Sequence, residues 1–371
     1  MRACVLGAAG TIGPAIVRDL ASSDEIADLL LLDLDADRAT AVADGIGDRE
    51  VRVAVADASD AAELAAAIEG FDVLVNAASY RLNLSVMDAC LRAGAHYMDL
   101  GGLYHVTASQ FETFAPAGGE DRFAAEGLLA VLGIGSSPGK TNLMAVQAAR
   151  ELGGRADTIR VAAAGRDMSP PAGLSFPYAL QTLIDELTLP PVVIRDGERV
   201  EMEPLTPAGT FDFGEPIGES ETIYTLHSEM LTFGDSFGCR EASFRLSLHE
   251  ELLLRLRELT SASAEAIAAA GREASPPSHD TVSVHMVEAA RGDRSVRVRA
   301  VTRPVEELAA GGGVASTAAP AAAAVRLIAR GDLPARGVHP PEGCIEPENL
   351  FAELSLRGCE FDVSVREAAF N

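Results

Sequence analysis

The stretch Gly7-Ala8-Ala9-Gly10-Thr11-Ile12-Gly13 decides the fold of the first domain. It follows the apolar run at residues 3–6 and opens a helix-forming stretch at residues 14–20, so the order is strand, glycine turn, helix. Glycines remove the side chains that would keep a pyrophosphate away from backbone N–H groups and from the positive end of the helix. The turn predicts a dinucleotide site with contacts from Gly7, Gly10, Thr11, Ile12 and Gly13.

An acidic residue after the next strand supports this reading. The apolar run at residues 29–32 ends in Asp33, and an acid at this spacing suits a ribose diol. The alternative, an ordinary glycine turn beside a surface aspartate, fits the spacing and context less well. The Asp33 carboxylate would repel a 2′-phosphate, whereas Arg38 nearby would accept one. We therefore expect NAD or NADP as cofactor, with NAD slightly favoured.

The length, composition and net charge of the chain limit the classes of molecule that it can bind. The 371 residues, 48% of them hydrophobic, suffice for two domains with buried cores. The formal net charge of −25 argues against nucleic acid and anionic membrane surfaces, because both attract cations. We expect a small-molecule substrate and neither a nucleic acid nor a membrane as partner.

The cysteines and the N-terminus bear on localisation. Five scattered cysteines form no CxxC pair, so we predict neither a disulfide nor a metal site, as fits a reducing cytosol. No cationic segment with a long apolar core opens the chain, and no uninterrupted apolar run reaches the roughly 18–20 residues that span a bilayer. We expect a cytoplasmic protein.

Alternating strand and helix signals predict an α/β fold. In the first domain, residues 1–135, this alternation implies a Rossmann doubly wound parallel sheet. Its predicted strands lie at residues 3–6, 29–32, 51–55, 73–75, 96–100 and 128–132. Residues 136–315 read as an inserted mixed-sheet α/β second domain, with strands at 158–163, 191–194, 222–226, 242–248, 282–287 and 296–301 and helices at 176–187 and from 248 to about 271. The C-terminal segment, residues 316–371, should return to one of the two domains.

Polar and small residues follow the ends of the predicted strands, where ligands bind in doubly wound sheets. Asp57 follows the third strand, where adenine commonly lies, and Asn76-Ala77-Ala78 follows the fourth, on the nicotinamide side. Strands five and six end in Asp99 and in residues 133–142, which should converge on the reactive ring. For Asp99 a catalytic role and a structural hydrogen bond or helix cap are equally open. In the last stretch we expect Gly135 and Pro138 to contact the cofactor, and Ser137 and Gly139 the substrate.

Lys140 is the only lysine among 30 basic residues. A need for a compact ammonium and chance survival are equally open explanations. A phosphate loop would need a glycine where this chain has Ile134. A short-chain dehydrogenase would need a tyrosine where it has Ser136. Both alternatives are disfavoured, so Lys140 is a candidate catalytic residue of a hydride-transfer site built with help from the second domain.

The second domain offers further candidates. His227-Ser228-Glu229 follows a predicted strand, and a histidine there can move a proton near neutral pH. Arg166 suits a bidentate clamp on a substrate carboxylate. Ordinary surface or core roles are the alternatives for all three. We expect His227 to be catalytic, and Glu229 and Arg166 to bind substrate.

Together these motifs resemble the saccharopine dehydrogenase-like family. The likeness rests on the glycine turn and on residues 95–100, 133–142, 183–188 and 227–229, and it spans most of the chain. It implies that the C-terminal segment completes the Rossmann domain, that the protein is a homodimer, and that the site lies in the interdomain cleft.

The resemblance also implies NAD(P)-linked hydride transfer at a C–N bond of an amino-acid-like or opine-like (saccharopine-type) substrate, amine to imine or the reverse. Saccharopine reductases carry an acidic residue directly before their proline–glycine pair, where this chain has Ser137, a departure that points away from saccharopine itself. The alternative from another class is a non-catalytic dinucleotide-binding redox sensor or regulatory protein.

Overall fold

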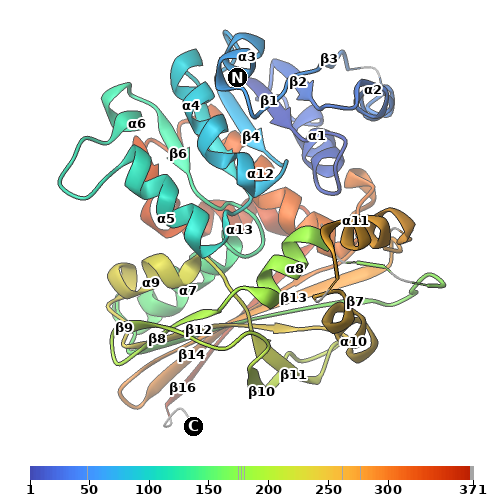
Figure 1. The fold of residues 1–371 in the computed structure, drawn as a ribbon. Coiled ribbons are helices and arrows are strands. Elements are labelled where there is room, and N and C mark those ends of the chain that lie inside the picture. Colours follow the sequence, from blue (N-terminus) through green and yellow to red (C-terminus); the bar gives the residue numbers. More distant parts are fainter. Residues whose placement is uncertain are drawn as a thin grey trace. The chain divides into compact units, whose positions relative to one another are not determined.

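The first predicted strands form a seven-stranded sheet in the computed structural model, which describes residues 1–47, 49–173, 175–176, 178, 180–260, 262–275 and 277–367. This sheet belongs to the Rossmann unit, which comprises Met1–Lys140 and Thr317–Leu354. Its strand pairs are all parallel, in the order β15-β6-β5-β4-β1-β2-β3 (Figure 1). The strands are β1 (Arg2–Leu6), β2 (Asp28–Leu32), β3 (Arg52–Ala54), β4 (Val73–Asn76), β5 (His96–Asp99), β6 (Leu129–Val131) and β15 (Gly337–His339).

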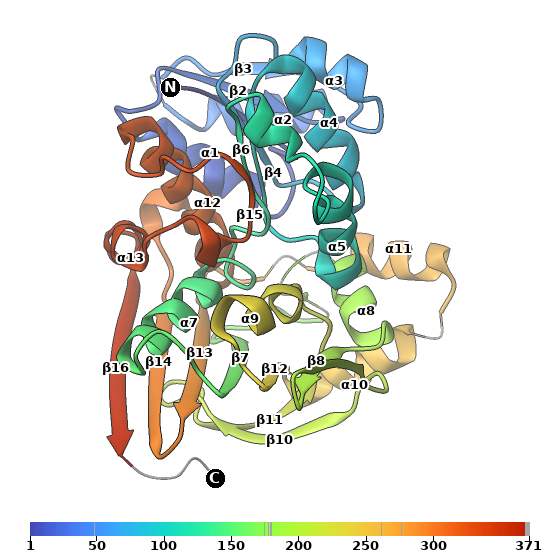
Figure 2. The ribbon, with the colours of Figure 1, turned by 90° about the vertical axis from the view of Figure 1, so that its left-hand side faces the viewer.

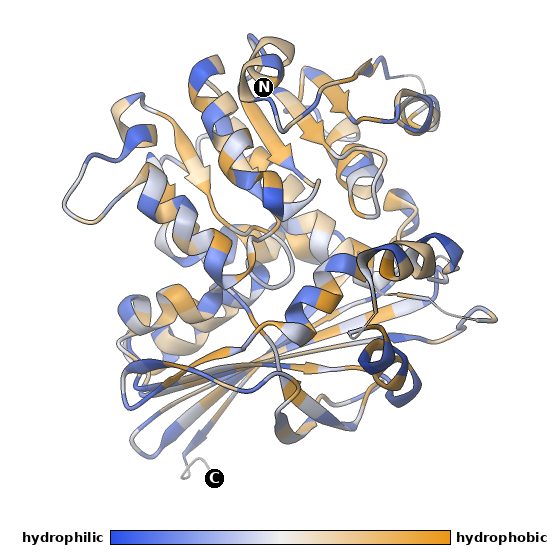
Figure 3. Cartoon of the chain, viewed as in Figure 1, coloured by the Kyte–Doolittle hydropathy of each residue, from blue (hydrophilic) through white to orange (hydrophobic). Residues whose placement is uncertain are grey.

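Helices cover both faces of this sheet. Figure 2 shows α3, α4 and α5 on one face and α1 and α12 on the other. Because both faces are covered, the central strands are unbroken apolar runs rather than alternating ones, as Figure 3 shows by colour. The helices are α1 (Gly13–Ala21), α2 (Ala36–Asp44), α3 (Ala61–Ala67), η1 (Tyr80–Leu82), α4 (Asn83–Ala93), α5 (Leu103–Phe114), α6 (Arg122–Ala125), η3 (Pro341–Gly343) and α13 (Pro347–Ser355), with most of α12 (Gly312–Arg330).

The second unit, Thr141–Ser316 and Ser355–Asn371, is built on a nine-stranded sheet. Its main path runs β10-β11-β12-β7-β13-β14-β16, with β8 on β12 and β9 on β8, and β12 and β7 are the parallel pair. The strands are β7 (Thr158–Asp167), β8 (Val192–Arg195), β9 (Glu198–Glu201), β10 (Pro207–Asp212), β11 (Glu219–Tyr224), β12 (Glu241–Ser247), β13 (Thr281–Arg291), β14 (Arg294–Thr302) and β16 (Cys359–Glu367). The predicted fold class, a Rossmann sheet with a mixed-sheet second domain, is confirmed.

The helices of the second unit differ from prediction: α7 and α9 were not expected, and the two expected helices have other bounds. They are α7 (Lys140–Glu151), α8 (Leu180–Thr188), α9 (Glu229–Phe237), α10 (Glu250–Leu259), α11 (Ala264–Glu273) and η2 (Glu306–Leu308). The single helix expected from 248 to about 271 is two helices, because the Ser263 side chain accepts a hydrogen bond from Ala266 N at 3.2 Å and begins a new helix there. The helix expected over 176–187 begins at Leu180; residues 177 and 179 lie outside the described residues.

The C-terminal segment divides between the two units. A buried ion network holds α12 and α13 in the Rossmann unit: Arg326 Nη1 lies 2.8 Å from Asp19 Oδ1 on α1, and Arg326 Nε lies 2.7 Å from Glu353 Oε2. Charges this deeply buried persist only when paired in this way. β16 instead pairs with β14 along its whole length, in the second sheet.

Helix α12 is long and apolar enough, by length and composition alone, to cross a membrane, although the sequence shows no uninterrupted apolar run of that length. Of its most apolar window, 78% is buried within the protein. A core helix has the same composition, so α12 is weak evidence for a membrane segment.

Candidate functional site

The glycine turn between β1 and α1 is built for close backbone approach. A Cβ on Gly13 would lie 2.2 Å from the Gly7 carbonyl oxygen, and one on Gly7 would lie 2.7 Å from Ala78 N. Gly7 also has φ +75°, which favours glycine. The turn therefore packs between α1 and the Ala77–Ala78 turn, with Gly10 and Thr11 exposed and no side chain capping α1. Such a cradle, which any Cβ would fill, fits a pyrophosphate.

Asp33, directly after β2, and Arg38, on α2, both form hydrogen bonds with the same turn. Asp33 Oδ2 accepts a hydrogen bond from Ala9 N at 2.9 Å, and Arg38 Nη2 donates to the Ala9 carbonyl at 2.5 Å. One carboxylate and one guanidinium thus lie at the end of β2, where a ribose is read in this fold. The structure brings together the two residues that we expect to influence the choice between NAD and NADP.

The turns after β3 and β4 are ordered by side chains. Asn76 Oδ1 accepts from Ala78 N at 3.0 Å, and Asn76 Nδ2 donates to Asn83 Oδ1 at 2.9 Å, which fixes the Ala77–Ala78 turn. Asp57 is exposed, and hydrogen bonds from the Ser59 side chain and backbone lower its pKa. Asn76 therefore positions the turn against which Gly7 packs.

Asp99 lies at the centre of a buried hydrogen-bond network. Its Oδ1 accepts from Gly101 N and Gly133 N, each at 2.8 Å. Its Oδ2 accepts from three side chains, those of Asn83, Tyr97 and Gln110. Burial raises the pKa of Asp99, and the hydrogen bonds from Gln110, Tyr97, Gly101 and Gly133 oppose the rise. The geometry favours the structural alternative for Asp99, which ties the turns after β5 and β6 together.

The loop after β6 closes on itself. Gly139 has φ +125°, and a Cβ there would lie 2.3 Å from Gly135 O, while Gly135 N donates to Pro138 O at 2.8 Å. Pro138 packs so closely on Gly133 that a Cβ on that glycine would lie 2.5 Å from the proline ring. Ser137 is half-buried in this loop.

Lys140 follows the loop directly and is 1% exposed as the first residue of α7. The tight Gly135–Gly139 loop therefore sets where the only lysine begins its helix. An ammonium so fully removed from solvent is rare among lysines.

Two buried glutamates flank His227 in the second unit. His227 Nδ1 lies 3.6 Å from Glu229 Oε2, at the start of α9, and His227 Nε2 lies 3.9 Å from Glu186 Oε1, on α8. The ring stacks on Phe244 of β12, with centroids 3.5 Å apart. All three polar side chains are buried. We call His227, Glu186 and Glu229 the histidine–glutamate cluster.

Further hydroxyls complete this cluster. Tyr178 donates its OH to Glu186 Oε2, and Thr141 Oγ1 donates to Glu229 Oε1 at 2.8 Å. The hydroxyl of Thr225, two residues before His227, is buried with no hydrogen bond from the described part of the protein. A buried hydroxyl group without a hydrogen-bond partner in the protein is expected to bond to an ordered water or to a ligand.

Proton affinities in the cluster are shifted. Burial lowers the pKa of His227, but the interaction with Glu229 and the charges of both glutamates outweigh it, so that the net shift is upward. Burial raises the pKa of Glu186, opposed by His227 and Tyr178. A histidine held between two carboxylates in this way is suited to take up or release a proton near neutral pH.

Arg166 has other partners. On β7, its Nη2 donates to Ser220 Oγ at 2.8 Å and to Ser247 Oγ at 2.9 Å, and its Nη1 donates to Gly165 O at 2.8 Å. None of these partners belongs to the histidine–glutamate cluster. The guanidinium braces β7 to β11 and β12, and its substrate-binding role stays a prediction.

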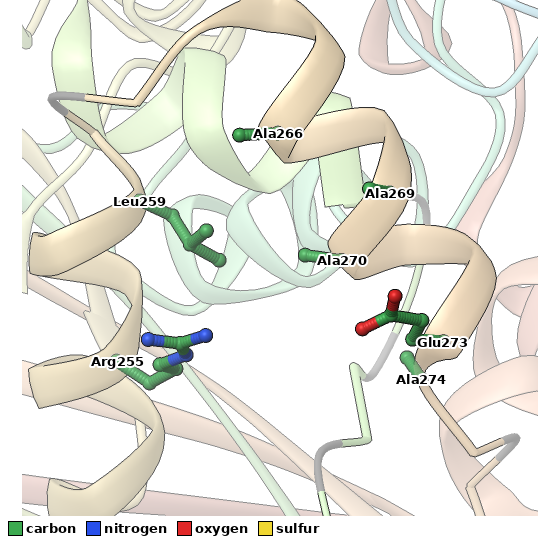
Figure 4. A pocket seen from close by; sticks show the side chains of 7 residues that line it. All are labelled: Arg255, Leu259, Ala266, Ala269, Ala270, Glu273 and Ala274. Atoms are coloured by element: carbon green, nitrogen blue, oxygen red, sulfur yellow. The ribbon is translucent and has the colours of Figure 1, made fainter.

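A separate pocket lies between α10 and α11 (Figure 4). Its volume is about 420 Å³, and its lining contains none of the predicted site residues. The lining residues are Arg255, Leu259, Ala266, Ala269, Ala270, Glu273 and Ala274. Among the described residues there is no group of three or more histidine, cysteine or acidic side chains arranged to hold a metal ion.

Sequence reasoning missed Glu186, Tyr178 and Thr141. Glu186 is more than forty residues before His227 in the chain, so no local spacing links the two. The one available signal was the segment 183–188, which contributed to the family resemblance without a role for its glutamate.

Comparisons with known proteins agree with this architecture. Residues 3–158 match the family model of the saccharopine dehydrogenase NADP binding domain. A carboxyaminopropylagmatine dehydrogenase from Synechocystis sp. is 30% identical over 142 residues, 38% of this chain and only 36% of that relative's length.

Two solved structures share the fold across the chain. Saccharopine dehydrogenase (L-Glu forming) from Saccharomyces cerevisiae is 15% identical and matches with a TM-score of 0.68, over 98% of this chain and 99% of its own. Homospermidine synthase from Legionella pneumophila, solved in complex with NAD, is 12% identical and matches with a TM-score of 0.73, over 99% and 91%. The predicted likeness to the saccharopine dehydrogenase-like family and the predicted cofactor class, NAD or NADP, are confirmed. Residues 3–158 thus match the saccharopine dehydrogenase NADP binding domain, and the chain as a whole shares its fold with these two structures.

Proposed function

We propose that this protein is an NAD(P)-dependent oxidoreductase that transfers hydride at a C–N bond of an amino-acid-like or opine-like substrate, converting an amine to an imine or the reverse. The observation that carries the proposal is the glycine cradle between β1 and α1, within a domain that matches an NADP binding family. Two relatives are dehydrogenases by name, of saccharopine and of carboxyaminopropylagmatine, which supports a nitrogen-bearing substrate.

The histidine–glutamate cluster supports a cationic substrate. Two buried carboxylates around one imidazole create negative potential, which attracts a protonated amine. Before hydride can leave the carbon, the neighbouring ammonium must lose a proton. In our proposal His227 accepts that proton, and Glu186 and Glu229 stabilise the resulting imidazolium. In the reverse direction His227 returns it.

The remaining residues have narrower proposed roles. The bound cofactor supplies or accepts the hydride. Gly7, Gly10 and Gly13 would hold its pyrophosphate, and Asp33 would hold its ribose. Asp99 positions the turns that face the reactive ring. Lys140 is the second proposed catalytic group, with Ser137 and Gly139 as substrate contacts beside it.

We further propose that the enzyme works as a homodimer in the cytosol. All five cysteines are free thiols, and four of them are buried. Free thiols in this number are typical of a reducing compartment. The dimer was expected from the family resemblance, and a surface that suits it is described below.

The test has two stages. Fluorescence titration with NADH and NADPH measures binding, and absorbance of the cofactor then reports turnover with paired α-keto acids and amines. We expect binding of at least one cofactor, turnover with at least one pair, and a loss of about 10²–10⁴-fold in kcat on His227→Asn. The exposed His249→Asn is the matched control and should keep full activity. Binding without turnover would favour the redox sensor, and no binding would refute the proposal.

A further inference from the structure

The second sheet ends in a long edge strand. β16 is paired with β14 over all nine of its residues, from Cys359 opposite Thr302 to Glu367 opposite Arg294. It is the last strand in the order of the sheet, and Figure 2 shows it at the outer edge beside β14. An edge strand of this length offers a row of backbone N–H and C=O groups to another strand.

The apolar face of the sheet continues to this edge and is uncovered there. Val363 and Val365 are 43% and 45% exposed, whereas their neighbours on β14, Val298 and Val296, are fully buried. Exposed valines in strand alternation on an edge strand are a liability for a protein that stays monomeric, and natural sheets usually place charges or a proline there. This exposure is what a strand partner would remove.

We propose that β16 is the dimer interface: two copies of the chain pair β16 to β16, antiparallel, about a two-fold axis through Val363. The inference rests on the homodimer in the proposed function and names the surface that forms it. With the axis through Val363, each residue stands opposite the residue of the second copy for which the two numbers sum to 726, which is twice 363. In an antiparallel pair, side chains that are directly opposite lie on the same face of the sheet.

The sequence of β16 is complementary to itself in this register. Glu360 stands opposite Arg366 of the second copy, and this pair occurs twice by symmetry. On the other face Phe361 stands opposite Val365, also twice, and Val363 meets itself on the axis. Among the described residues of one copy, Glu360 forms an exposed ion pair with Arg303, 3.7 Å away, and an exposed pair of this kind contributes little to stability.

Neighbouring registers fit less well. An axis through Asp362 would place that carboxylate against its own copy, and like charges directly opposite are destabilising. An axis through Ser364 would pair only residues 361–367 and set Phe361 opposite Glu367. An axis between residues would place Val363 opposite a polar residue of the second copy. The register through Val363 pairs all nine residues: it matches Glu360 with Arg366 and Phe361 with Val365, and it sets Cys359 opposite Glu367 and Asp362 opposite Ser364.

Charge reversal tests this register. We expect sedimentation velocity to show a dimer for the wild type, and at least tenfold weaker dimerisation for Glu360→Arg, which sets Arg opposite Arg366, and for Arg366→Glu. The double variant, Glu360→Arg with Arg366→Glu, exchanges the partners and should restore the dimer. Its recovery excludes misfolding of the single variants as the cause. A monomeric wild type, or single variants that dimerise normally, would overturn the proposal.

Cross-linking tests the axis itself. Val363→Cys should give a covalent dimer with a short bis-maleimide, whereas wild type, with its five native cysteines, should not. Ser364→Cys, which stands opposite Asp362 rather than its own copy, should cross-link markedly less. Equal cross-linking of the two variants would contradict an axis through Val363. Cofactor binding and turnover are measured separately, so a failed interface and a failed enzyme assignment remain distinguishable.

Discussion

The Nδ1 atom of His227 lies 3.6 Å from Oε2 of Glu229, and both side chains are buried. Two residues apart in sequence, they meet because the chain turns from the region after β11 into α9 between them. Glu186 approaches the opposite ring nitrogen from α8. The two carboxylates thereby raise the pKa of His227 despite burial, which makes the proton affinity of this ring a property that folding controls.

The first prediction concerns pH and stability. The folded-state pKa of His227 is raised above its ordinary 6.5. The resulting stabilisation is fully present below the unfolded-state pKa and is lost as pH rises through the raised folded-state value. His227→Asn should therefore cost more free energy of unfolding at about pH 6 than at about pH 9, measured by urea denaturation. The exposed His249→Asn should show no such difference; an equal loss at both pH values for His227→Asn would contradict the raised pKa.

The second prediction concerns the glycine cradle. In Gly13→Ala the new Cβ would meet the Gly7 carbonyl, so the turn must shift and cofactor affinity should fall at least about tenfold, or about 1.4 kcal/mol. Isothermal titration with NADH and NADPH measures this. Gly165→Ala is the matched control, because the nearest atom to its Cβ is 4.0 Å away. Unchanged affinity in Gly13→Ala would place the cofactor elsewhere.

The third prediction concerns cofactor choice. The wild type should bind NADH more tightly than NADPH because the Asp33 carboxylate repels a 2′-phosphate. Asp33→Asn should improve NADPH binding relative to NADH by about tenfold. Arg38→Ala should instead weaken NADPH binding relative to NADH binding. If the ratio of the NADH and NADPH affinities is the same in all three proteins, these residues do not contact the ribose or its 2′-phosphate.

The fourth prediction separates a structural from a catalytic Asp99. Asparagine offers one acceptor oxygen in place of two, so at least two of the five donors around Asp99 would lose their partner. Asp99→Asn should lower the free energy of unfolding of the cofactor-free protein by about 1–3 kcal/mol. The exposed Asp57→Asn serves as comparison. Wild-type stability with lost turnover would instead assign Asp99 to the chemistry.

Much of the Rossmann unit could be predicted because its signals are local. The glycine turn, the apolar run before Asp33 and the polar residues after each strand are all within a few residues of the features they determine. The strands missed were those with weak patterns: β9 and β10 are mostly exposed, and β15 is only three residues long. β16 was not predicted, because its alternating apolar residues lie on a face that remains exposed.

The candidate site was predicted only in part because its second half is assembled over long sequence separations. His227 and Glu229 are two residues apart and can be predicted together, whereas Glu186 on α8 and Tyr178 just before α8 reach them only through tertiary packing. The charge of Arg166 suits a substrate carboxylate, yet the guanidinium already donates hydrogen bonds to three strands of the second sheet. A sequence shows which groups can carry chemistry; packing determines which of them are already engaged.

The most direct test of the proposed reaction follows the hydride itself. NADH and NADPH carrying deuterium at the transferable position are incubated with the enzyme and paired α-keto acids and amines, and products are analysed by mass spectrometry. We predict deuterium on the carbon that bears the new C–N bond, in the wild type and His249→Asn and strongly reduced in His227→Asn. Tight cofactor binding with no deuterium transferred to any product would contradict the assignment as a C–N oxidoreductase and leave a dinucleotide-binding sensor.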